Sequence, residues 1–171
     1  MKVQQLLVRA LFGCVLVGAS GAAMAGPELP SDSSCPLGVI LNEAVNNLTV
    51  QGQDCLVQDA IIVGNVKVSN RPGEVFVLRD SIVNGRVRIT GGAVSITGTE
   101  VITSNLVVKD TTEAVVRNTL VRVGNMRFEG NDYVLLISNT VSDGNIRCVK
   151  NILELAVENI IPNGVETCFG Q

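Results

Sequence analysis

Histidine and tryptophan are absent from the 171-residue chain, and aromatic residues make up only 3% of it. The absence of histidine excludes Ser-His-Asp and Cys-His catalysis and zinc sites with imidazole ligands. Charged residues are also few, at 17%, and the net charge of −3 argues against nucleic acid as the main partner. With 46% hydrophobic residues the chain is nevertheless too apolar to be disordered, and its length suggests one domain.

The first 25 residues have the pattern of a cleaved export signal. A basic start with Lys2 and Arg9 precedes an apolar run of small residues, and Ala23-Met24-Ala25 forms a small-x-small cleavage site. The apolar run is too short and too rich in Gly and Ala for a membrane span. We therefore expect residues 1–25 to be a signal peptide cleaved after Ala25, no integral span afterwards, and a periplasmic or secreted protein. A membrane or buried helix, or a lipid anchor at Cys14, are the alternatives.

Cleavage would change both the charge and the cysteine count. It would leave 11 Lys and Arg against 16 Asp and Glu, a net charge of −5. It would also leave an even set of four cysteines, which in an exported chain indicates disulfides.

A repeat of about 20 residues runs through the remaining chain. Its marks are glycines separated by 21, 39, 20 and 20 residues, with Ser104 standing in the one missing place. These glycines are Gly64, Gly85, Gly124, Gly144 and Gly164. Similar segments begin at the marks: GNVKV, GRVRI, SNLVV, GNMRF and GNIRC. An internal repeat of this length indicates a stacked architecture.

Stacking the repeats places Val, Ile and Leu in columns with a spacing of two, as in strands with alternate faces buried. Such a coil cannot bury its apolar side alone, whereas stacked coils form a continuous core. The sequence thus predicts an all-β fold, a single β-solenoid of about six 20-residue coils over residues 48–171. Residues 26–47 are expected to form a polar lead and a short N-terminal cap, with a short helix within 36–47.

The chain resembles secreted right-handed parallel β-helix proteins of pectin-lyase-like architecture over about residues 48–168. Coil length, aliphatic stacking and asparagines at the turns carry the resemblance, and these asparagines are Asn65, Asn105, Asn125 and Asn145. The resemblance implies right-handed winding. Enzymes of this architecture use clustered carboxylates on the outer face of one sheet. The outward positions show no such pair, so we expect no catalytic residues, no metal and no cofactor.

The cysteine spacing equals one coil in both halves of the chain. Cys35 and Cys55 are 20 residues apart, as are Cys148 and Cys168. Residues one coil apart have Cα atoms about 5 Å apart, which is within disulfide range. We therefore predict one disulfide at the cap and one at the last coil. Two buried thiols are the alternative for the second pair.

Two surface features could bind a partner. The first is a basic ladder interrupted by Val107, suited to an acidic polysaccharide or to lipopolysaccharide phosphate: Lys67, Arg88, Arg127 and Arg147. Its alternative is a solvated strand face that discourages aggregation. The second is an apolar outward stripe suited to a partner or to self-association: Phe76, Leu78, Val115, Leu135 and Ile137. Its alternatives are coverage by the N-terminal segment or a register shifted by one residue.

Together these features predict an exported, non-catalytic β-solenoid that acts as a binding or structural module in the periplasm or outside the cell. Two other functions stay open: a small polysaccharide-binding or polysaccharide-modifying β-helix, and a self-assembling surface or matrix component.

Overall fold

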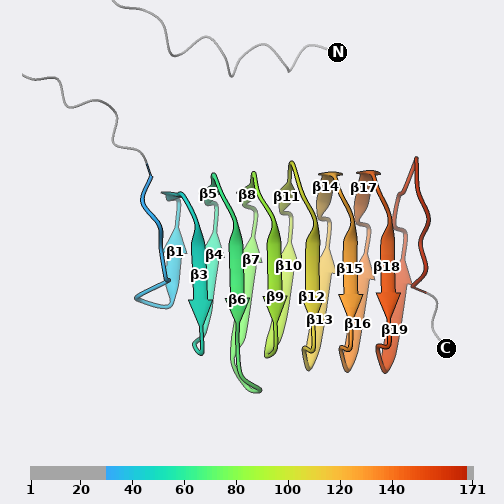
Figure 1. The fold of residues 1–171 in the computed structure, drawn as a ribbon, viewed down its shortest axis with the longest axis horizontal. Helices are drawn as coiled ribbons and strands as arrows, with labels where there is room; N and C mark the ends of the chain where they lie inside the picture. The colour runs from blue at the N-terminus through green and yellow to red at the C-terminus, as the bar shows by residue number, and fades with distance from the viewer. Residues whose placement is uncertain (1–29, 169–171) are drawn as a thin grey trace, which may run out of the picture.

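The chain winds into a right-handed parallel β-solenoid, shown in Figure 1 by a computed structural model that describes residues 30–168. This confirms the predicted fold class. The described residues form 19 strands and no helix, so none of them could cross a membrane as a helix. The expected signal peptide and its cleavage site after Ala25 lie outside the described residues.

Three parallel sheets run along the rod, and each is named here by its first strand. The β1 sheet contains β1 (Val39–Leu41), β4 (Cys55–Gln58), β7 (Val75–Arg79), β10 (Ala93–Thr97), β13 (Glu113–Arg117), β16 (Tyr133–Ile137) and β19 (Leu153–Val157). The β2 sheet contains β2 (Ala44–Val45), β5 (Ile61–Ile62), β8 (Ile82–Val83), β11 (Glu100–Val101), β14 (Leu120–Val123) and β17 (Thr140–Asp143). The β3 sheet contains β3 (Leu48–Gln51), β6 (Val66–Ser69), β9 (Val87–Thr90), β12 (Leu106–Lys109), β15 (Met126–Glu129) and β18 (Ile146–Val149).

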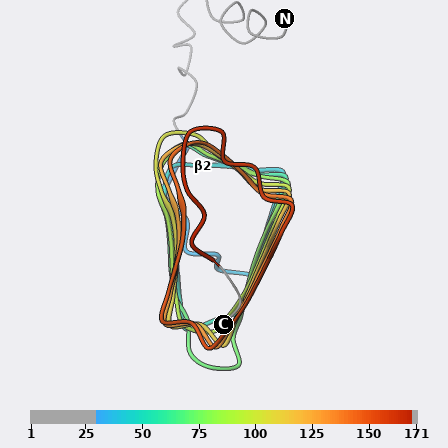
Figure 2. The same cartoon turned by 90° about the vertical axis from the view of Figure 1, so that its right-hand side faces the viewer.

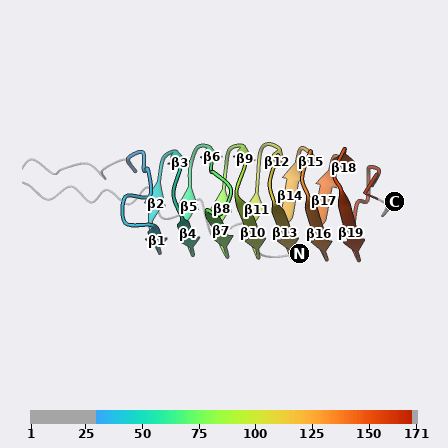
Figure 3. The ribbon, with the colours of Figure 1, turned by 90° about the horizontal axis from the view of Figure 1, so that it is seen from below.

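The coils superpose closely when the rod is viewed along its axis (Figure 2). The β1 and β3 sheets form two long sides, and the short β2 sheet closes the wider end. Equivalent strands of successive coils follow one another along the rod (Figure 3). Each long side therefore has one face toward the core and one flat face toward solvent.

Left-handed backbone makes the corner between the β1 and β2 sheets in every coil. The residue there has a φ between 47° and 63°, and the seven residues are Asn42, Asp59, Asp80, Gly98, Asn118, Ser138 and Glu158. Gly, Asn and Asp tolerate this conformation best, and they occupy five of the seven positions. Local chemistry thus fixes where the chain leaves the β1 sheet.

Aliphatic columns fill the interior. The middle inward column of the β1 sheet is completely buried from the second coil to the sixth: Val57, Leu78, Ile96, Val116 and Leu136. Phe76 and Phe128 are the largest side chains in the core, and both are 0% exposed. The narrow space between two sheets is filled by Val, Ile and Leu, which accounts for the low aromatic content.

The prediction that Phe76 and Leu78 face outward is wrong. Leu78 pairs with the buried Ile96, so Val77 is the outward residue of β7. The cause is a difference in coil length: three residues separate β8 from β9, whereas four separate β11 from β12. Alignment on the glycine marks therefore shifts β4 and β7 by one residue, and such a shift moves every side chain to the other face.

The short helix predicted within 36–47 is also wrong, because these residues form β1 and β2 of the first coil. Gly38 and Asn42 have positive φ angles, which interrupt any helix, and Ile40 and Val45 are buried in the core. The cap consists of the preceding segment, in which Ser33 bridges to Leu48 of β3.

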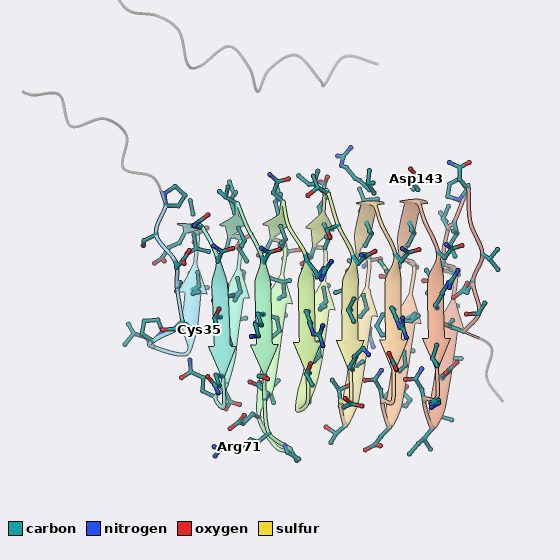
Figure 4. The ribbon with its side chains drawn as sticks, in the orientation of Figure 1. Cys35, Arg71 and Asp143 are labelled. Atoms are coloured by element: carbon teal, nitrogen blue, oxygen red, sulfur yellow. A yellow bond between two sulfur atoms is a disulfide. The ribbon has the colours of Figure 1, made fainter. Side chains whose placement is uncertain are left out.

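Both predicted disulfides are present, one near each end of the rod. Cys35 and Cys55 have Cα atoms 6.2 Å apart, and those of Cys148 and Cys168 are 4.9 Å apart. Cys35 is labelled at the N-terminal end in Figure 4. Closing a loop of roughly 20 residues stabilises a fold by roughly 3 kcal/mol in the chain-entropy treatment. Each bridge therefore holds an end coil that has a neighbour on only one side.

Asparagine side chains hydrogen-bond from coil to coil at the corners. Asn139 is buried, its Oδ1 accepts from the backbone N–H of Thr119 at 3.1 Å, and its Nδ2 donates to the Val116 carbonyl at 2.9 Å. Asn131 makes the equivalent contact with Thr111 at the opposite corner. These contacts satisfy buried backbone groups that the strand ladders leave unpaired at the corners.

The register of the core can be tested with two adjacent valines of β13. Val116→Asp places an uncompensated carboxylate in the core and should cost on the order of 4 kcal/mol, enough to unfold the protein. Val115→Asp places the same group on the outer face and should leave the folded state intact. Circular dichroism and thermal melting of both variants measure this, and equal stability of the two variants would contradict the assigned faces.

Glycine is required at the corner that contains Gly144. Its φ is 152°, and an added Cβ would lie 1.8 Å from the Gly124 carbonyl oxygen. Gly144→Ala should therefore destabilise the protein by about 1–3 kcal/mol through backbone displacement. Gly73→Ala is the control, because Gly73 also has a positive φ but an added Cβ there would have no atom within 4 Å. Urea unfolding should show the larger loss for Gly144→Ala, and a larger loss for Gly73→Ala would contradict the close-contact argument.

Candidate functional site

The predicted basic ladder lies on the outer face of the β3 sheet. Strand pairing places Lys67 beside Arg88, and Arg127 beside Arg147, with Val107 between the two pairs. Neighbouring strands are about 4.8 Å apart, so the ladder is a row of cations parallel to the rod axis. Figure 4 shows nitrogen-bearing side chains across this face.

Two further cations, which the sequence prediction did not include, lie on this face. Lys109 is two residues after Val107 in β12 and so points to the same side. Arg86 immediately precedes β9, at the position where other coils carry asparagine. Strand alternation could have identified Lys109. Arg86 was visible in the sequence only as an exception to the asparagine column.

These cations line a hollow of about 540 Å³. Its charged lining residues are Arg86, Arg88, Lys109, Arg127 and Arg147, and its other lining residues are Asn105, Asn125, Asn145 and Val107. A second hollow of about 530 Å³ shares Arg86 and Arg88 and extends to Lys67. Because the two hollows share residues, we describe them as one groove, the β3 groove.

Charge is segregated on the surface of the molecule. The strands of the β3 sheet carry five Lys and Arg residues and one carboxylate, Glu129, although the whole chain has 16 acidic and 13 basic residues. Many of the acidic residues lie at corners, including Asp59, Asp80 and Asp110. The β3 groove is therefore positive on a molecule that is negative overall.

Glu129 neutralises part of the face. It forms ion pairs with Lys109 and with Arg127, the latter at 2.9 Å. The hydrogen bond from Lys109, together with the charges of Arg127 and Lys109, lowers the pKa of the Glu129 carboxyl below its ordinary value of 4.5. Glu129 is therefore ionised at neutral pH and is a weak point in the positive field.

The asparagine ladder forms a fixed edge of the groove. The backbone N–H groups of Asn125 and Asn145 donate to the Oδ1 atoms of Asn105 and Asn125, at 2.7 and 3.0 Å. The Nδ2 groups of Asn125 and Asn145 donate to the same two oxygen atoms at 3.1 Å. The polar edge is thus ordered before any ligand arrives.

The predicted apolar stripe is only partly formed. Val115, Leu135 and Ile137 are partly exposed on the outer face of the β1 sheet, but Phe76 and Leu78 are in the core. Val75 and Val77 take the outward positions of that coil.

One group of metal-ligand residue types occurs in residues 30–168. Cys148, Glu154 and Cys168 have their ligand atoms within 4.8 Å of one another. The two sulfur atoms are joined in a disulfide, so neither is a thiolate ligand while the bridge is intact. This group therefore belongs to the structural closure of the last coil.

Comparison of the chain with protein-family models, with curated proteins and with solved structures finds no match. The functional argument is therefore built on the geometry of the chain itself.

The state of Glu129 predicts how stability depends on pH. A carboxyl whose pKa is lowered by folding contributes stability above its unfolded pKa of 4.5, and this contribution is lost as the pH falls through the lowered value. Glu129→Gln should therefore melt at a lower temperature than the parent at about pH 7, and the difference should shrink below the ordinary pKa of 4.5. Melting temperatures from about pH 2.5 to about pH 7 measure this, with Glu113→Gln on the β1 sheet as control. A difference that does not change with pH would contradict the ion-pair assignment.

Proposed function

We propose that the protein is an exported, non-catalytic binding module and that its β3 groove holds an acidic polysaccharide. The observation that carries this proposal is the lining of the groove, in which five cations meet and no carboxylate is present, on a chain with an excess of acidic residues. A cationic groove on an acidic protein concentrates anionic ligands locally.

The spacing of the groove suits a linear polymer. Arg88, Arg127 and Arg147 occupy one register column, so a chain lying along the rod meets a cation at regular intervals of one or two coils. Arginine binds carboxylate and sulfate groups through two parallel hydrogen bonds, which adds orientation to charge attraction. The ordered asparagine edge offers amide groups to sugar hydroxyls along the same line.

Export is the second part of the proposal. The leader-like pattern of residues 1–25 supports it, and two disulfides weakly favour an oxidising compartment. The proposal also includes the likeness to secreted pectin-lyase-like proteins, which is supported by right-handed winding, a coil of about 20 residues and stacked aliphatic columns.

Charge reversal in the groove tests the proposal. A triple variant with Arg88→Glu, Arg127→Glu and Arg147→Glu should bind polygalacturonate or dextran sulfate at least about tenfold more weakly, since each exposed ion pair contributes up to about 1 kcal/mol. Affinity of the parent should also fall as salt rises, because exposed charges are screened. Isothermal titration or biolayer interferometry measures both effects.

The matched control is the pair Arg79→Glu and Arg117→Glu on the β1 sheet, which changes the net charge without touching the groove. In the opposite direction, Val107→Lys fills the gap in the ladder and Glu129→Gln removes the carboxylate, so both should strengthen binding. Equal loss in the groove variant and the control would reduce the effect to net charge and would contradict a site. A separate measurement with lipopolysaccharide decides whether phosphate groups on a lipid-linked glycan are preferred over uronate or sulfate groups.

A structural role without a ligand makes a different prediction. The basic face would then only keep the strands soluble, and the parent would show no saturable binding to any of these polymers.

A further inference from the structure

The outer face of the β1 sheet is a flat apolar surface with a continuous central column. Strand pairing aligns its residues from one end of the rod to the other, and Ser95 is the single polar member. The six apolar members are Val39, Leu56, Val77, Val115, Leu135 and Leu155. Leu155 is 50% exposed and Val39 is 44% exposed, so the column reaches solvent at both ends.

The size of this face matches a modest protein interface. Seven strands about 4.8 Å apart and five residues of about 3.3 Å give a face of roughly 29 by 17 Å, or roughly 500 Å² in projection. Burial of this face on two copies removes roughly 1,000 Å², at the lower end of specific interfaces. A pair formed this way should associate in the micromolar range rather than permanently.

Three charged residues flank the apolar column, and their positions restrict the partner. Glu113 and Arg117 lie at opposite ends of β13, and Arg79 is in the same register column as Arg117, two strands away. If two copies pack face to face about a two-fold axis parallel to the rod, β13 lies opposite β13 of the second copy with reversed direction. Glu113 of each copy then faces Arg117 of the other copy.

The other face-to-face arrangement is unfavourable. A two-fold axis parallel to the strands reverses the order of the coils, so β13 of one copy lies opposite β7 of the other. Arg117 then faces Arg79, and Glu113 faces the apolar Val75. Like charges across an interface cost affinity, whereas opposite charges select the register.

We propose that a second copy of this chain docks on the outer face of the β1 sheet, with the two rods parallel and the two sheets face to face. The two copies bury their central columns against each other and exchange two Glu113–Arg117 ion pairs. A two-fold contact of this kind closes on itself and gives a dimer rather than a filament. The β3 sheets of the two copies remain on opposite outer sides of this dimer.

Sedimentation velocity over a concentration series of the purified protein tests the dimer. The parent should change from monomer to dimer with a midpoint in the micromolar range and should not grow further. Leu135→Lys should weaken dimer formation at least about tenfold, because it places a charge in the middle of the buried column. Val107→Lys on the β3 sheet is the matched control and should dimerise like the parent.

The ion pairs are tested by charge exchange within β13. Glu113→Arg and Arg117→Glu should each weaken dimer formation, and the double variant should restore it. The two residues are four positions apart on one extended strand, about 13 Å, so they do not contact each other within a copy. Restoration by the double variant therefore reports a contact between copies, and its absence would overturn the proposed register.

The direction of the rods is tested by crosslinking. In the parallel arrangement Val77 faces Val77 of the second copy, whereas in the reversed arrangement it faces Val115. Val77→Cys in a Cys14→Ser background should thus form a disulfide-linked dimer on mild oxidation. A monomer at all concentrations would overturn the proposal, as would open-ended growth, which would indicate stacking through the coil ends. Dimers that are insensitive to Leu135→Lys would place the interface elsewhere and would overturn it as well. Circular dichroism of each variant verifies that it is folded.

Discussion

The hydrogen bonds between successive coils are the constraint on which the rest of the structure depends. Each strand pairs in parallel with the equivalent strand about 20 residues away, so no coil is stable without its neighbour. The corners serve this pairing, because a left-handed residue at the same point of every coil returns the chain to the same path. The two disulfides reinforce the fold near its ends, where an end coil has only one neighbour.

The same register organises the surface into columns with separate properties. Inward columns are aliphatic, as the core demands, whereas outward columns are free to vary. The β3 sheet carries cations, the β1 sheet carries an apolar column, and many carboxylates lie at the corners. Two flat faces with different chemistry therefore lie back to back across one narrow core, and each can bind its own partner without obstructing the other.

A dimer through the β1 sheet would also influence binding at the β3 groove. Two grooves on one particle bind a long polymer with higher avidity than a single groove when the polymer can reach both. Because the rods are parallel in the proposed dimer, both grooves run in the same direction along the rod. A weak site of exposed ion pairs would then be strengthened without any additional contact in the groove.

The sequence by itself determined the repeat, the all-β solenoid, the disulfide pairs and the ladder from Lys67 to Arg147, because regular spacing of residues along the chain is enough to define each of them. Only the tertiary structure decided that Phe76 is in the core, that residues 36–47 form strands, and that Arg86 and Lys109 join the ladder in one groove. The physical reason is that a single additional residue between β11 and β12 changes the alignment of coils, and only the pairing of strands fixes which alignment is formed. The face on which a side chain lies is a property of that pairing and not of the residue's distance from a glycine.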